Sequence, residues 1–310
     1  MMIDFSYFYK DKYSFDEIPT NESYDLLLSA YDGCDRTKKI FDKIVADTKK
    51  WIIYPHYEIL DSVSDSFLVP TFQEDDDELV NFIKSLNINS STKICIDITG
   101  FLRPHLIYLT ILLNTVYEVK KIDFLYTEPN YYENAEETVF SGAISEAPRV
   151  IKGCSSIKSY SNFDNDILII NAGYDDKLIS SVTKDKSKIS KKFIILGFPS
   201  LQPDFYQENI FQIKKAKDEI GQVEKQSFAP AYDPFETANR IKEIVNENCS
   251  DSNVYLSPLS TKPQTLGVLI YFLWYKDTHS LNIIFPFSNK YRKKTAIGIN
   301  HTWKYSIELR

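Results

Sequence analysis

The sequence predicts an α/β protein made of two Rossmann-like lobes, each with a largely parallel sheet and helices on both faces. Short β-rich runs alternate with amphipathic helical runs from Tyr24 onward, which is the pattern of βαβ units. The chain has 310 residues, enough for two fused lobes and a sizeable core. Its 43% hydrophobic and 25% charged residues are ordinary for a globular protein.

The N-terminal lobe is predicted to span residues 1–127. Its strands are expected to be YDLLLSAY, KWIIYPHY, KICIDIT and KIDFLYT, at residues 24–31, 50–57, 93–99 and 121–127. Its helices are expected to be DRTKKIFDKIVADT, DDDELVNFIKSL and RPHLIYLTILLNTVYE, at residues 35–48, 75–86 and 103–118, because apolar residues recur three and four apart in them.

Residues 128–165 show no sustained period and are predicted to form a connecting segment, with a hairpin insertion around ETVFSGAISEA at 137–147. The C-terminal lobe is predicted to span 166–310. Its expected strands are DILIINA, KKFIILGF, NVYLSPL and LNIIFPF, at 166–172, 191–198, 253–259 and 281–287. Its expected helices are 175–184, 207–220, 233–248 and 262–275. WKYSIEL at 303–309 alternates in polarity, which favours an antiparallel edge strand.

Charge and cysteine content narrow the class of protein. With 36 basic and 43 acidic side chains, the net charge of −7 argues against broad binding to duplex nucleic acid. A local contact remains open at NKYRKK, through Lys290, Arg292, Lys293 and Lys294, although a solvated loop is the usual meaning of such a run. Four separated cysteines form no CxxC pair, and no apolar run approaches a membrane span, so we expect a soluble, cytoplasmic protein.

The stretch ICIDITGFLRPHLIYL places four chemically useful residues between two buried elements. Asp97 and Thr99 close the strand, Gly100 permits a tight turn, and Arg103 precedes the proline that opens a helix. In open α/β sheets, ligands bind at such carboxyl strand ends, beside helix N-termini. Because a carboxylate repels phosphate, Asp97 would suit a sugar hydroxyl, a base amino group or a catalytic proton transfer.

A comparable loop, SPLSTKPQ, follows the strand at 253–259. It offers Ser257, Ser260 and Thr261 as donors, and Lys262 directly precedes a proline at a helix start. We expect an anionic group to be held in a cleft between the lobes, with Arg103 and Lys262 on phosphate. The alternative is that both loops are ordinary capped helix starts.

Three further residues are weaker candidates for the ligand site. Asp32 and Arg36 follow the first strand, where Asp35 is expected to be the helix N-cap, and Tyr126 lies at another strand end. The acidic run QEDDDEL is expected to begin a helix, so no metal site is predicted there. The chain lacks GxGxxG after a strand, GxxxxGK[ST] and GxSxG, so we expect no cofactor.

The turn DITGFLRP, together with LSTKPQ, resembles the ligand loops of CRISPR-associated Rossmann-fold (CARF) domains and of the related two-lobed SAVED sensor domains. Those domains hold cyclic nucleotide second messengers with a Thr/Gly/Lys-containing turn at a strand end. The match covers two loops, and the tandem glycines common in such turns are replaced here by Gly100-Phe101 and Leu259-Ser260. The resemblance implies a sensing role for Thr99, Arg103, Thr261 and Lys262, with a separate effector protein providing the output.

Three functional hypotheses follow from the sequence. The first is binding or sensing of a nucleotide or other phosphorylated small molecule, in signalling or defence. The second is a hydrolase or transferase of nucleotide metabolism that uses Asp97. The third is a non-catalytic module that contacts a protein or nucleic acid. The ligand, the presence of catalysis and the oligomeric state are left open by the sequence.

Overall fold

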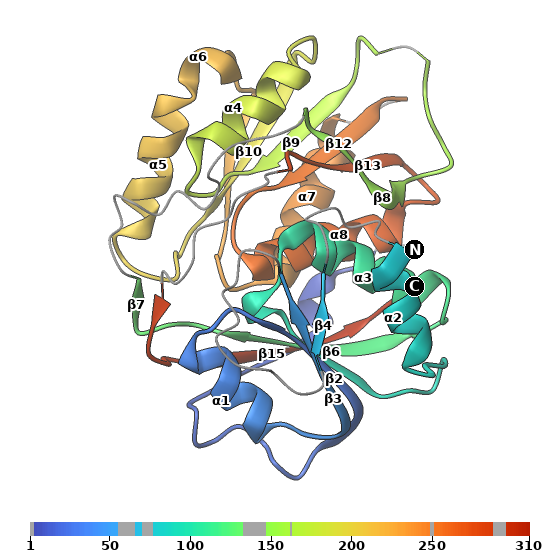
Figure 1. The fold of residues 1–310 in the computed structure, drawn as a ribbon. Helices are drawn as coiled ribbons and strands as arrows, with labels where there is room; N and C mark the ends of the chain where they lie inside the picture. Colours follow the sequence, from blue (N-terminus) through green and yellow to red (C-terminus); the bar gives the residue numbers. More distant parts are fainter. Residues whose placement is uncertain are drawn as a thin grey trace. The chain divides into compact units, whose positions relative to one another are not determined.

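The computed structural model describes residues 3–54, 66–69, 77–132, 147–161, 163–248, 251–287 and 296–310. The chain divides into two compact units. Unit 1 comprises Met1–Tyr7 and Thr138–Lys290, and unit 2 comprises Phe8–Glu137 and Tyr291–Arg310. Each unit is an α/β structure with a mostly parallel sheet and helices on both faces (Figure 1), which confirms the predicted fold class.

The described part of unit 2 contains a seven-stranded sheet in the order β1-β15-β6-β5-β2-β3-β4. Five strands are parallel, while β15 and β1 add antiparallel pairings at one side. The strands are β1 (Tyr9–Tyr13), β2 (Ser23–Tyr31), β3 (Val45–Ile53), β4 (Ser66–Leu68), β5 (Ile94–Asp97), β6 (Lys121–Thr127) and β15 (Thr302–Glu308). All four residues of β5 are buried, as expected for a strand covered on both faces.

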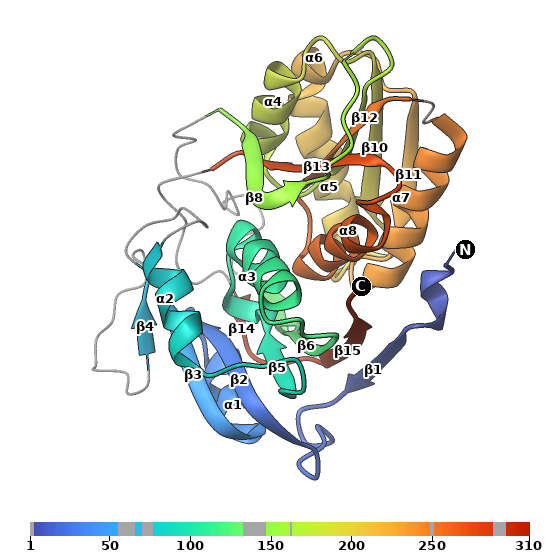
Figure 2. The same cartoon turned by 90° about the vertical axis from the view of Figure 1, so that its right-hand side faces the viewer.

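Chain order in this sheet reverses between β2 and β5. The chain runs outward from β2 through β3 to β4, then crosses to β5 and continues to β6. Crossover helices therefore fall on opposite faces, with α1 on one side and α2 and α3 on the other (Figure 2). Their bounds are α1 (Asp35–Lys43), α2 (Asp77–Ser85) and α3 (Arg103–Thr115), with the 3-10 turn η2 (Ile98–Gly100) before α3.

Unit 1 repeats this strand order in a six-stranded sheet, β11-β10-β9-β12-β13-β8, within the described residues. Its chain order reverses between β9 and β12, and only the pairing of β8 with β13 is antiparallel. The strands are β8 (Arg149–Ser155), β9 (Ile167–Asn171), β10 (Lys191–Gly197), β11 (Lys225–Ala229), β12 (Asn253–Pro258) and β13 (Ser280–Phe285).

The helices of unit 1 also divide between two faces, with α4, α5 and α6 on one and α7 and α8 on the other (Figure 1). They are α4 (Asp176–Asp185), α5 (Phe205–Lys215), α6 (Lys217–Ile220), α7 (Pro234–Asn248) and α8 (Lys262–Tyr275), and the 3-10 turn η1 (Phe5–Tyr7) packs on α7. A small two-stranded ladder in unit 2 joins β7 (Tyr131–Tyr132) to β14 (Ala296–Ile297). No helix in the described ranges is long and apolar enough to cross a membrane.

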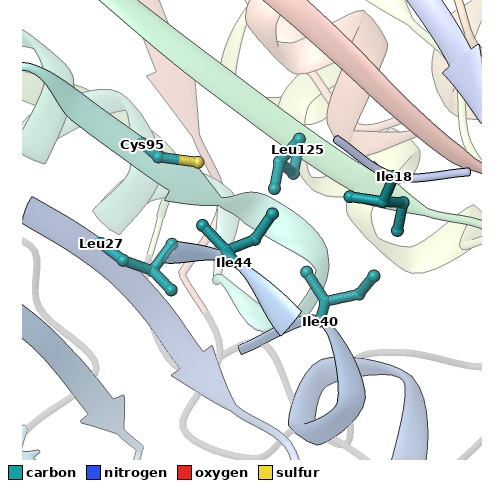
Figure 3. Packing of buried hydrophobic residues seen from close by; sticks show 6 residues of the cluster. All are labelled: Ile18, Leu27, Ile40, Ile44, Cys95 and Leu125. Atoms are coloured by element: carbon teal, nitrogen blue, oxygen red, sulfur yellow. The ribbon is translucent and has the colours of Figure 1, made fainter. Parts of the chain in front are cut away.

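One cluster of the hydrophobic core joins α1 to the sheet of unit 2 (Figure 3). Ile40 and Ile44 at the end of α1 pack with Leu27, Cys95 and Leu125 from the strands and with Ile18. Burial raises the pKa of the Cys95 thiol well above its ordinary value, so this cysteine stays protonated as part of the core. Cys34, Cys95 and Cys154 are all buried, and none of them belongs to a disulfide.

The lobe boundaries in the structure differ from those expected from the sequence. The predicted C-terminal lobe ran to residue 310, but β15 pairs with β6 and therefore belongs to unit 2. The alternating segment is an antiparallel strand, as expected, yet it is not an edge because β1 pairs with its other side. The predicted connection at 128–165 contains β7 and β8, and the hairpin expected at 137–147 lies outside the described residues apart from residue 147.

Candidate functional site

Asp97 ends β5 at the carboxyl edge of the unit 2 sheet, where it is completely buried. The hydroxyl of Ser29 on β2 donates to its Oδ2 at 2.9 Å, and the backbone N–H of Thr99 donates to its Oδ1 at 3.1 Å. The carboxylate thereby caps η2 and joins the two strands at which the chain order reverses. Both contacts are made within unit 2 and satisfy a buried carboxylate, as expected if the loop is an ordinary capped turn.

Burial raises the pKa of Asp97 above its ordinary value. The hydrogen bonds from Thr99 and Ser29 oppose that rise in the pKa, and the nearby charge of Asp32 adds to it. The folded protein therefore binds the Asp97 proton more tightly than the unfolded chain does.

The structure brings four predicted residues of unit 2 into one buried network. Thr99 Oγ1 accepts a bond from the backbone N–H of Thr127 at 3.0 Å. Arg36 Nη1 donates to the carbonyl oxygen of Thr127, also at 3.0 Å, and its Nη2 lies 3.8 Å from Asp32 Oδ2. Through these contacts Asp97, Thr99, Asp32 and Arg36 connect β2, β5, α1 and β6.

The start of α1 differs from the expected cap. Cys34, rather than Asp35, occupies the N-cap position, and Asp35 is the first helical residue. The carboxylate that stabilises this turn is Asp32, whose Oδ1 accepts bonds from Cys34 N at 2.9 Å and from Thr37 Oγ1 at 2.7 Å. Asp32 closes an Asx-type turn two residues earlier, so the acid nearest the helix is not the one that caps it.

The other predicted residues of unit 2 have different environments. A Cβ atom on Gly100 would lie 2.0 Å from the carbonyl oxygen of Ala30, so only glycine fits this close approach. Arg103 is the half-buried first residue of α3, and Tyr126 is a buried residue of β6. Arg103 lies in unit 2 and Lys262 in unit 1, so the shared cleft stays a prediction.

The SPLSTKPQ loop of unit 1 builds the start of α8. Thr261 is its N-cap and accepts a bond from Gln264 N at 3.3 Å, while its hydroxyl also donates to the carbonyl oxygen of Ala231. Ser260 Oγ donates to Oε1 of Gln264, and Nε2 of Gln264 donates to the carbonyl oxygen of Ala229. Lys262 is the half-buried first residue of the helix. These bonds fix the loop to the end of β11 and to the segment that follows it.

Two polar side chains at the carboxyl edge of unit 1 lack hydrogen bonds. Among the described residues, neither Oδ1 nor Nδ2 of Asn171 has a partner, although the residue is only 1% exposed. Oγ of Ser257, which is completely buried, has no partner there either. Asn171 ends β9 and Ser257 lies near the end of β12, the two strands at which the chain order reverses.

Strand register shows which helix layer Asn171 faces. Asn171 is level with Ile195 of β10, so Gly197, two residues further, points to the same face. A Cβ atom on Gly197 would lie 3.4 Å from Oε1 of Gln264 on α8. Asn171 therefore faces the layer that contains α8, whereas Ser257, level with Ile170, faces the opposite layer.

Asn171 was not singled out from the sequence. The signal was present in DILIINA, where one amide side chain ends an otherwise apolar strand at a carboxyl end. Sequence reasoning gave weight to the loop 257–262 instead, because charged and hydroxyl residues there stand next to a proline.

Two expectations from the sequence concern the basic run NKYRKK and metal binding. Lys290, Arg292, Lys293 and Lys294 lie outside the described residues, so the expected contact through NKYRKK stays a prediction. Among the residues that the structure describes, no three His, Cys, Asp or Glu side chains gather as metal ligands would.

Comparison with known proteins adds no functional assignment. No protein-family model matches the sequence, and no curated protein matches it. Among solved structures, one described as the crystal structure of an N-terminal ketoreductase from a macrolactin assembly line aligns over 88% of this chain and 72% of its own, with 12% sequence identity and a TM-score of 0.24. At that TM-score the match assigns no function to the chain.

Proposed function

We propose that unit 1 binds a nucleotide or other phosphorylated small molecule at the carboxyl edge of its sheet, beside Asn171 and the first turn of α8. The observation that carries the proposal is the buried amide of Asn171, which has no partner among the described residues. A buried polar group without a hydrogen bond costs about 1 to 3 kcal/mol. A side chain that destabilises its own fold in this way is explained if a ligand supplies the missing bonds.

The charge distribution at this edge favours an anion at α8 over one at α4. Helix α4 is capped by the carboxylate of Asp175, which accepts bonds from Lys177 N and Leu178 N and already offsets the positive end of the helix dipole. Helix α8 is capped by the neutral hydroxyl of Thr261 and begins with the cation of Lys262. A phosphate would therefore be stabilised at the start of α8 by both the dipole and the lysine.

An aromatic group lies at the same edge of the sheet, on the layer of α5 rather than the α8 layer that Asn171 faces. Phe198, just after β10, lies 5.0 Å from Tyr206 of α5 and 6.1 Å from Phe228 between ring centroids. Phe198 is 51% exposed and Phe228 is 43% exposed, so the rings are available only to a base that extends across the sheet edge from the start of α8. Backbone bonds from Phe198 to Ala229 and from Ala231 to Pro199 connect these rings to the loop that receives the Thr261 hydroxyl.

We further propose that this binding serves to sense a nucleotide. The resemblance of the two predicted loops to CARF and SAVED domains favours a nucleotide second messenger, whose binding would be read by a separate effector protein. In unit 2, Asp97, Thr99 and Arg36 bond to Ser29 and to the backbone of Thr127. Asn171 at the carboxyl edge of unit 1 has no partner among the described residues, so unit 1 is the proposed binding unit.

The test is binding of a nucleotide panel to the full chain, measured by thermal shift and isothermal titration calorimetry. The panel contains ATP, 3′,5′-cyclic AMP, a cyclic dinucleotide and a cyclic trinucleotide. We expect at least one of these to bind, and Asn171→Leu or Lys262→Gln to weaken that binding about tenfold, as expected for one lost charge-assisted hydrogen bond.

Lys188→Gln is the matched control, because this exposed lysine precedes β10 and lies at the opposite edge of the same sheet. It should leave the affinity unchanged. No response to any nucleotide, or equal affinity in the Asn171→Leu and Lys262→Gln variants, would refute the proposal and leave an ordered water as the partner of Asn171.

A further inference from the structure

Unit 2 has a pocket at the amino ends of its strands. It has a volume of about 700 Å³ and is lined among others by Tyr24 of β2, Lys121 and Asp123 of β6, and Lys304 and Ser306 of β15. This volume lies within the range of about 300 to 1,000 Å³ that is usual for small-molecule sites. The pocket is at the edge opposite to Asp97 and Gly100, so none of the predicted site residues contributes to it.

The floor of the pocket is a fixed polar network around a buried lysine. Lys304 is 7% exposed and pairs with Asp123 Oδ2 at 3.1 Å and with Glu22. The hydroxyls of Tyr24 and Ser306 also donate to Asp123, at 2.8 and 2.6 Å. Since each of these side chains fixes its neighbours, the acceptor groups of the floor are held in place before a ligand arrives.

The rim of the pocket is lined mainly by cations, whereas the floor holds the carboxylates. Lys93, Lys120 and Lys121 are exposed side chains at the starts of β5 and β6, and Tyr9, which is 59% exposed, presents its ring at the same opening. The lining holds four lysines and two carboxylates, a local net charge of +2 in a chain whose net charge is −7. An anionic group would therefore be attracted to the rim, while hydroxyl groups would find carboxylate acceptors at the floor.

From these contacts we propose that the pocket binds a small phosphorylated sugar. The phosphate pairs with Lys93, Lys120 and Lys121 at the rim. The sugar hydroxyls donate to the carboxylate of Glu22, whose side chain is exposed to the pocket beside the buried lysine. The face of the sugar ring packs on Tyr9 and Tyr24. This site is independent of the one proposed in unit 1, because no residue is common to both.

Isothermal titration calorimetry of the full chain with ribose 5-phosphate, ribose and inorganic phosphate tests the proposal. We expect ribose 5-phosphate to bind more tightly than either fragment. The variant Lys93→Gln/Lys120→Gln/Lys121→Gln should bind it at least about tenfold more weakly. Glu22→Gln should weaken ribose 5-phosphate severalfold and leave inorganic phosphate unaffected.

A control variant removes the same charge elsewhere. Lys39→Gln/Lys188→Gln/Lys217→Gln changes three exposed lysines on α1, after α4 and on α6, and should keep the wild-type affinity. If both triple variants bound ribose 5-phosphate equally weakly, the loss of affinity would come from the net charge of the protein, and the proposed site would be wrong. Absence of binding by ribose 5-phosphate, or ribose binding as tightly as its phosphate, would overturn it as well.

Discussion

The hydroxyl of Ser29 and the carboxylate of Asp97 meet across two strands of unit 2, 2.9 Å apart. Both residues lie where the chain order of that sheet reverses, which is the place where open α/β sheets bind ligands. In unit 1 the same topological position holds Asn171 and Ser257, whose side chains have no hydrogen-bond partner among the described residues. The same strand order thus carries bonded Ser29 and Asp97 side chains in unit 2, and in unit 1 the side chains of Asn171 and Ser257, which have no partner among the described residues.

The first prediction compares two buried asparagines of unit 1. Asn171→Leu removes an amide that has no partner, so we expect it to raise the free energy of unfolding of the ligand-free protein by about 1 to 3 kcal/mol. Asn253→Leu removes an amide that donates to Tyr160 O and Asp166 and accepts from Tyr160 N and Ser280. It should lower the same quantity by about 3 kcal/mol.

Urea denaturation of the two variants and the wild type, without added ligand, measures these differences. If Asn171→Leu destabilised the protein as much as Asn253→Leu does, the amide would have partners after all. The basis for a ligand at Asn171 would then be gone.

The second prediction concerns pH. Because burial raises the pKa of Asp97 in the folded state, the stability associated with its protonated form is complete below the unfolded value of 3.8 and falls as the pH rises above it. Asp97→Asn keeps a neutral side chain at this position at every pH. We therefore expect the stability of Asp97→Asn relative to the wild type to increase as the pH rises from about 4 to about 7.

Denaturation at a series of pH values checks this trend. Asp47→Asn, which removes the same charge at an exposed site on β3, corrects for general charge effects. A stability difference between Asp97→Asn and the wild type that stays constant over the range, or narrows with rising pH, would show that burial does not dominate the titration of Asp97.

The sequence was sufficient for most of the strands and for the fold class, because buried parallel strands have a simple apolar signature. KIDFLYT was expected at 121–127, and β6 spans Lys121–Thr127. The segment 35–48 was expected to be one helix, but α1 ends at Lys43 and β3 begins at Val45. Its helical spacing continues through residues whose backbone instead pairs with β2, and such pairing is a long-range contact that local periodicity does not contain.

The site was harder to predict than the fold. Asp97 and Thr99 were chosen as residues of a ligand loop, yet their partners are Ser29 and Thr127, each distant in the sequence. A polar residue at a strand end looks the same whether it awaits a ligand or braces a neighbouring strand. Only the tertiary contacts separate Asp97, which has its partners, from Asn171, which lacks them among the described residues.

The third prediction concerns the buried cation Lys304. Burial lowers its pKa, but hydrogen bonds and charge from Glu22 and Asp123 outweigh that effect and raise it, so Lys304 remains charged. Lys304→Met would leave the carboxylate of Asp123 without its cation, and we expect a loss of about 3 kcal/mol in the free energy of unfolding. Lys225→Met removes an exposed pair with Glu247 and should cost less than about 1 kcal/mol.

Urea denaturation at low and high salt separates the two cases. The effect of Lys304→Met should persist at high salt, because a buried pair is screened less than an exposed one. Equal and small effects for the two lysines would mean that Lys304 contributes no more than a surface pair.

The last prediction tests the carboxyl edge of unit 2 at its tightest point. A methyl group on Gly100 would meet the carbonyl oxygen of Ala30 at 2.0 Å, and the obstacle is backbone at the end of a central strand, which has little room to move. Gly100→Ala should therefore lower the free energy of unfolding by about 3 kcal/mol. Gly197→Ala, whose added methyl group would come closest to the end of the Ala231 side chain, at 3.1 Å, should cost about 1 kcal/mol. Thermal denaturation of both variants checks the contrast, and a Gly100→Ala protein as stable as Gly197→Ala would mean that the carbonyl of Ala30 moves away from Gly100 at little cost.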